Sequence, residues 1–144
     1  MTLRSWLASG WLTEHRTSSQ EVRALLAIAD RDLADCLASG LSPDWRLNIA
    51  YNAALQIATV ALAACGYQAL RSDGHCWTIQ TLAHTLGDGR LSRQLDQFRK
   101  KRNADAYEMA GTVSDQEAQE MVALAAEMRR RVQAWLEANY ASLL

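Results

Sequence analysis

Apolar residues recur at helical spacing along almost the whole chain, and no stretch shows the alternation of apolar and polar residues that is typical of a half-buried strand. The single proline, Pro43, follows a serine and precedes an aspartate. That arrangement is typical of the start of a helix and not of a break within one. The chain is therefore predicted to be all-α.

Serine N-caps and glycine-containing breaks divide this helical pattern, and Ser18 with Glu21 and Ser114 with Glu117 have the spacing of a capping box. The expected helices cover residues 2–12, 18–38, 43–64, 75–86, 91–107 and 114–140, with a polar connection over 67–74. The segment 43–64 is rich in alanine, which allows close helix packing, so it is expected to be central. The predicted architecture is an up-and-down antiparallel four-helix bundle with one or two additional short helices.

Length and composition are those of one compact domain spanning residues 1–144. Hydrophobic residues make up 49% of the chain and charged residues 22%, so the chain can form a real core. A net charge of −1 gives no overall signature of nucleic-acid binding. Any recognition of anions is therefore expected from local basic clusters, namely residues 99–102 and 129–131.

The three cysteines, Cys36, Cys65 and Cys76, are odd in number and not closely paired, so reduced thiols are expected. His75 and His84 lack a second group of ligands, and neither a metal nor a cofactor is predicted. The N-terminus lacks the long apolar core of a signal peptide, and the most apolar run is too short to span a bilayer. We expect a soluble, cytoplasmic protein without a membrane partner.

The most distinctive part of the chain is residues 95–108. Four of the fifteen basic residues fall at positions 99–102, and Asn103, Asp105 and Tyr107 follow with little apolar filler. On a helix, a guanidinium, an amide and a phenol would then gather within one or two turns. Arginine offers a planar pair of donors, asparagine a donor and an acceptor, and tyrosine a stacking face with a hydroxyl. Such a group suits a phosphate or a nucleotide.

The same residues also fit an exposed helix face without a ligand. A basic run is often a solvated face, and Asp105 at helical spacing can neutralise Arg102 or Lys101. The candidate ligand-binding residues are Arg99, Arg102, Asn103, Asp105 and Tyr107.

Three segments in order suggest a family. The alanine-rich helix has a polar start, Asn-Ile-Ala-Tyr-Asn-Ala-Ala-Leu at 48–55, and a histidine stands near the start of the next helix. A Leu-x-x-Phe-Arg-x-x-Arg-Asn-x-x-x-Tyr-Glu segment at 95–108 and a Ser-x-x-Glu cap at 114–117 follow. Over residues 17–140 the chain resembles the HEPN domain (higher eukaryotes and prokaryotes nucleotide-binding). The resemblance implies an up-and-down helical bundle, often encoded beside a minimal nucleotidyltransferase and commonly a homodimer.

The resemblance implies one of two functions. Many HEPN proteins are RNases, several of them toxins of toxin–antitoxin pairs, which use an Arg followed by a His after a few intervening residues. Others lack that pair and bind nucleotide or RNA. Here Arg102 and Asn103 match the Arg and the polar residue after it, but Tyr107 stands where the His is expected. A phenol, with a pKa of about 10, accepts a proton poorly near neutral pH. We therefore expect a nucleotide- or RNA-binding module that partners a nucleotidyltransferase in a toxin–antitoxin-like pair.

Two alternatives stand beside this expectation. In an RNase, Arg102 would stabilise charge and Tyr107 or His75 would be a non-standard acid–base group, so these three are the candidate catalytic residues. In a helical dimerisation protein the basic stretch would only aid solubility, and there would be no ligand.

Other polar and aromatic residues leave their roles open. His75 either fixes a loop or reaches Arg102 across the bundle. A polar stripe on the central helix either lines a small pocket facing Arg102 or forms a wet outer face. Its members are Asn48, Tyr51, Asn52 and Gln56. The five tryptophans are expected mainly in the core or a dimer interface, with a base-stacking platform as the alternative.

Overall fold

The structure is a computed structural model and describes residues 2–70, 74–107 and 113–144, with the backbone alone described for 103–107. The helices are α1 (Leu3–Ala8), α2 (Ser19–Asp35), α3 (Pro43–Ala64), α4 (Gly74–Gln80), α5 (Leu82–Thr85), α6 (Gly89–Tyr107) and α7 (Asp115–Asn139). Two strands, β1 (Leu12–Glu14) and β2 (Tyr67–Ala69), and a 3₁₀ helix, η1 (Ala141–Leu143), complete the described elements.

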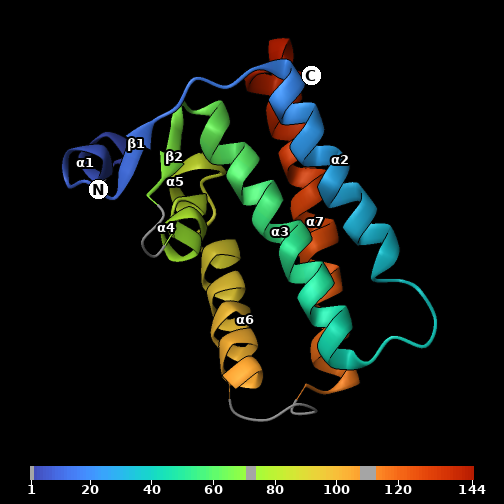
Figure 1. The fold of residues 1–144 in the computed structure, drawn as a ribbon. Helices are drawn as coiled ribbons and strands as arrows, with labels where there is room; N and C mark the ends of the chain where they lie inside the picture. The colour runs from blue at the N-terminus through green and yellow to red at the C-terminus, as the bar shows by residue number, and fades with distance from the viewer. Residues whose placement is uncertain (1, 71–73, 108–112) are drawn as a thin grey trace.

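The four long helices, α2, α3, α6 and α7, confirm the all-α fold class (Figure 1). α3 packs along its length against α2 and α7, and α6 lies against α3 from another side. In Figure 1 successive long helices run in alternating directions. This arrangement brings the C-terminal part of α6 beside the N-terminal part of α3, which decides where the candidate site forms.

α3 is the centre of the hydrophobic core, as the alanine-rich sequence predicts. Ala53, Ala54, Ala58 and Ala61 are almost inaccessible to solvent, and their small side chains allow α2 and α7 to approach closely. By length and composition alone α3 is long and apolar enough to cross a membrane, but 67% of its most apolar window is buried inside the protein. α3 is therefore a core helix of this fold.

The chain forms a small sheet where the sequence pattern predicts a helix and a connection. α1 ends at Ala8 and not at residue 12, because Gly10 takes a φ of 81°, a left-handed conformation that ends the helix. Residues 12–14 then pair antiparallel with residues 67–69. Strands of three residues are too short to show the alternation by which a strand is recognised in a sequence.

The helix predicted over 75–86 is also divided, into α4 and α5. The division falls at Thr81, whose buried hydroxyl donates to the carbonyl of Thr78 at 2.6 Å. Such local bonds from a threonine side chain compete with the regular helix pattern. The long helices begin and end within about three residues of their predicted bounds.

Serine side chains begin three of the long helices, α2, α3 and α7, as predicted. Ser114 accepts a hydrogen bond from the amide of Glu117, and the Glu117 side chain accepts one from the amide of Ser114, which is a complete capping box. Ser18 caps α2 in the same way, but the carboxylate of Glu21 binds His15 and Thr17 instead of closing the box. Glu21 thus ties the segment before α2 to its first turn.

Three tryptophans fasten the N-terminal residues to α4. Trp11 and Trp77 stack with ring centres 4.5 Å apart, and Trp6 meets both rings edge-on. Trp6 is buried in a small second core with Leu12 and Leu62. These three rings serve packing, as predicted for most of the tryptophans. Trp45, by contrast, is 64% exposed.

Candidate functional site

Arg102 of α6 lies against the start of α3. Its Nε donates a hydrogen bond to Oδ1 of Asn48 at 3.0 Å, and its guanidinium carbon lies 5.0 Å from the centre of the Tyr51 ring. Asn48 in turn donates to the carbonyl of Asp44 at 3.0 Å, which fixes the orientation of its amide. The polar stripe on α3 therefore faces Arg102 through Asn48 and Tyr51, whereas Asn52 is exposed.

Tyr51 is a buried tyrosine with an unused hydroxyl. Its side chain is 0% exposed, and within the described residues its hydroxyl has no hydrogen-bond partner. Burial raises the pKa of the Tyr51 phenol, against the opposite influence of the Arg102 and Arg99 charges. The phenol therefore stays protonated at neutral pH and has a hydrogen to donate.

His75, in the first turn of α4, lies near the Tyr51 ring. The two ring centres are 6.4 Å apart, and the His75 side chain is exposed. Desolvation lowers the pKa of His75, and the positive charges of Arg102 and Arg99 lower it further. The imidazole is therefore neutral at pH 7, the form that accepts a proton. The His75 ring thus lies near Tyr51, but among the described residues no hydrogen bond joins it to Arg102, so both alternatives for His75 stay open.

Arg102 differs from its basic neighbours in its partners. Arg99 donates to Asp96 at 2.8 Å and the amine of Lys100 lies 3.4 Å from the same carboxylate, while Lys101 pairs with a glutamate of α7. Although partial burial raises the pKa of Asp96, the hydrogen bonds and charges of Arg99 and Lys100 lower it overall. Among the described residues, no carboxylate forms an ion pair with Arg102. The contacts described for its guanidinium are with an uncharged amide and an aromatic ring.

Three of the predicted ligand-binding residues cannot be placed in the same way. Asn103, Asp105 and Tyr107 belong to the last part of α6, but their side chains lie outside the described residues. The neutralisation of Arg102 by Asp105 and the stacking role of Tyr107 remain predictions.

The second basic cluster, residues 129–131, has a structural role. Arg129 of α7 donates to Asp30 of α2 at 2.7 Å, and Arg131 pairs with Asp88 ahead of α6. Hydrogen bonding by Arg131 lowers the pKa of Asp88. Arg129 and Arg131 thus tie α7 to α2 and to the residue before α6.

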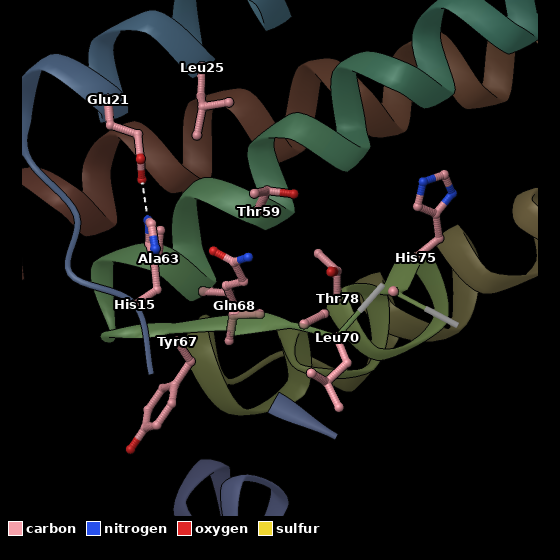
Figure 2. A pocket seen from close by; sticks show the side chains of 13 residues that line it. His15, Glu21, Leu25, Thr59, Ala63, Tyr67, Gln68, Leu70, His75 and Thr78 are labelled. Atoms are coloured by element: carbon pink, nitrogen blue, oxygen red, sulfur yellow. Dashed lines mark hydrogen bonds and ion pairs between the residues drawn. The ribbon is translucent and has the colours of Figure 1, made fainter. Parts of the chain in front are cut away.

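His75 also lines one end of a cavity of about 510 Å³ (Figure 2). Residues from α2, α3, β2 and α4 line it. Figure 2 shows Thr59, Gln68 and Thr78 in the middle of the lining, between a His15–Glu21 pair at one end and His75 at the other. The sequence contains no motif for this cavity, because its walls come from segments far apart in the chain and from a strand that the pattern did not predict.

Within the part of the chain that the structure describes, no group of three or more His, Cys, Asp or Glu side chains could hold a metal ion. Comparison of the chain with protein-family models, characterised proteins and solved structures finds no match.

Proposed function

We propose that this protein is a HEPN-like module that binds a nucleotide or RNA through a phosphate at Arg102. The observation that carries the proposal is the set of contacts of the Arg102 guanidinium. The guanidinium contacts the Asn48 amide and the face of the Tyr51 ring, and it has no carboxylate partner among the described residues. A charge arranged in this way has lost part of its hydration and gains from an anion.

The geometry leaves the right atoms for a phosphate. Asn48 occupies Nε of Arg102, so the two terminal nitrogens can bind an anion as a bidentate pair. Tyr51 is fully buried, so it contributes its ring face, which supports the guanidinium, and not a direct contact with the anion. Asn103 and Tyr107, which follow Arg102 on α6, would add a polar and a stacking contact.

Replacing Arg102 by alanine tests the proposal. Retention of a mixed RNA pool by Arg102→Ala is expected to fall by about tenfold or more, because a charge-assisted bidentate contact is lost. The dependence of binding on salt is expected to weaken by a slope of about 1, as for the loss of one phosphate contact. Arg102→Lys keeps the charge but not the planar fork, and is expected to restore binding only in part.

Arg130→Ala is the matched control, because Arg130 is an exposed arginine of α7 and does not belong to the basic stretch 99–102. Its RNA retention is expected to equal that of the unaltered chain. Equal retention by Arg102→Ala and Arg130→Ala would contradict the proposal and reduce the basic stretch to a solvated face.

A second function, an RNase, is favoured by one observation, the neutral His75 beside the Arg102 cluster. A neutral imidazole can take the proton of a ribose 2′-hydroxyl while Arg102 stabilises the developing charge. Cleavage should then be lost in both His75→Gln and Arg102→Ala. Since only the neutral form is a base and the pKa of His75 is lowered, cleavage should persist below pH 6.5 and fall at more acidic pH.

A cleavage assay on the same RNA pool decides between the two functions. RNA retention without cleavage identifies a binding module, and cleavage that survives His75→Gln assigns the base to another group such as Tyr107. If neither retention nor cleavage occurs, a helical dimerisation protein is the function left.

The proposal includes partners and location. We propose a homodimer that works beside a nucleotidyltransferase in a toxin–antitoxin-like pair in the cytoplasm, where its free cysteines would stay reduced. Light scattering of the purified chain tests the dimer. Co-purification with a nucleotidyltransferase encoded by a neighbouring gene tests the pair.

A further inference from the structure

The cavity beside His75 has the size and lining of a small-molecule site. Its volume of about 510 Å³ lies within the range of about 300–1,000 Å³ that ligand pockets occupy. Leu25, Leu62, Ala63 and Leu70 give it apolar walls. Such walls favour a ring that can leave water at little cost.

The polar groups of the cavity are suited to an uncharged ligand with hydrogen-bonding edges. The Thr59 hydroxyl donates to the carbonyl of Leu55 at 2.8 Å and keeps its oxygen free to accept. Among the described residues, the side-chain amide of Gln68 has no hydrogen-bond partner, so it can offer both a donor and an acceptor. The two ionisable side chains at the far end, His15 and Glu21, already bind each other at 2.6 Å.

His75 connects the cavity to the cationic cluster. It lines the cavity and also stands 6.4 Å from the Tyr51 ring, over which Arg102 lies at 5.0 Å. The imidazole and the guanidinium are thus no further apart than these two steps together. His75 therefore marks the end of the cavity that lies toward Arg102, and a ligand whose ring lies at that end would present a charged substituent on the Arg102 side.

We infer that the cavity holds the base of a nucleotide whose phosphate binds Arg102. This inference rests on the proposed function and names its ligand as a nucleoside monophosphate, either free or as the end of an RNA. The base lies between the apolar walls with its edge toward Gln68 and Thr59. The ribose passes His75, and the phosphate meets Arg102.

Calorimetric titration with matched ligands tests the inference on the full chain. The four nucleoside 5′-monophosphates are compared with ribose 5-phosphate, which lacks the base. At least one nucleotide is expected to bind about tenfold or more tightly than ribose 5-phosphate, because a base buried against apolar walls adds to the phosphate contact. Arg102→Ala is expected to weaken both kinds of ligand.

Filling the cavity separates the base from the phosphate. In Gln68→Trp the indole would occupy the cavity, so the advantage of the nucleotide over ribose 5-phosphate should disappear while ribose 5-phosphate binds as before. Gln20→Trp is the matched control, because Gln20 is exposed on α2 outside the lining, and it should keep the advantage. If Gln68→Trp does not fold, Thr59→Met reduces the cavity from α3 with the same expected result.

The outcomes distinguish this inference from the proposed function. Equal binding of nucleotide and ribose 5-phosphate, with Arg102-dependent RNA binding intact, overturns the base site alone. Nucleotide binding that is insensitive to Arg102→Ala overturns the link between cavity and cluster. Absence of any nucleotide and RNA binding overturns both proposals.

Competition identifies the source of the ligand. An RNA with a free 5′-phosphate that displaces the bound nucleotide, when the same RNA with a blocked end does not, identifies an RNA terminus as the occupant. A nucleotide that no RNA displaces is bound as a free ligand. Either result supports the base site.

Discussion

In Tyr51 the ring and the hydroxyl have different effects: the ring belongs to the proposed site, and the hydroxyl affects stability. Its ring supports Arg102 and faces His75, and its hydroxyl is buried without a partner among the described residues. An unsatisfied buried hydroxyl lowers stability by about 1–3 kcal/mol. The part of Tyr51 that serves the proposed site is therefore its ring, which supports Arg102.

Replacing Tyr51 by phenylalanine tests this interpretation. Tyr51→Phe keeps the ring under Arg102 and removes the hydroxyl, so the free energy of unfolding in urea should be unchanged or rise by about 1 kcal/mol. RNA retention should stay close to that of the unaltered chain, because the ring under Arg102 is kept and the buried hydroxyl does not reach the phosphate. A fall in RNA retention, or a loss of stability, would contradict this interpretation and show that the hydroxyl has a partner.

The contact between Arg102 and α3 was predicted only as one of two possibilities. Helical periodicity places Asn48 and Tyr51 on one face of α3, but it does not say what that face meets. Arg102 and Asn48 are 54 positions apart, and no local pattern links them. The roles of Asn103, Asp105 and Tyr107 stay predictions.

At the scale of the element, the start of α7 shows how local sequence rules act. The first turn of a helix has free backbone amides. At the start of α7 the side chains of Ser114 and Glu117 each accept a hydrogen bond from the backbone amide of the other residue. Such a motif is complete in the sequence itself. The start of α7 was therefore predicted to within one residue.

Ser114→Ala is expected to lower the free energy of unfolding by about 1 kcal/mol, the usual cost of losing an N-cap. Urea unfolding followed by far-ultraviolet circular dichroism measures the change. Ser39→Ala, at an exposed serine after α2, serves as the control and should have almost no effect. A change in Ser114→Ala no larger than in the control would mean that neighbouring packing, and not the cap, holds the start of α7.

At the scale of the whole molecule, the central place of α3 was predictable and its surroundings were not. Its alanines and caps identify a long helix that packs closely against others. Nothing local indicates that β2, which follows it, would pair with residues near the N-terminus. The local sequence also does not indicate that β2, α2, α3 and α4 would line the cavity beside His75.

The sequence by itself determined the all-α class and most helix bounds, because caps, glycine ends and apolar periodicity all act within a few turns of the chain. Only the tertiary structure decided the β1–β2 pairing, the contacts of Arg102 with Asn48 and Tyr51, and the cavity. Each of these joins segments that are distant in the chain. Their energies depend on which surfaces meet during packing, and a one-dimensional pattern carries little information about that choice.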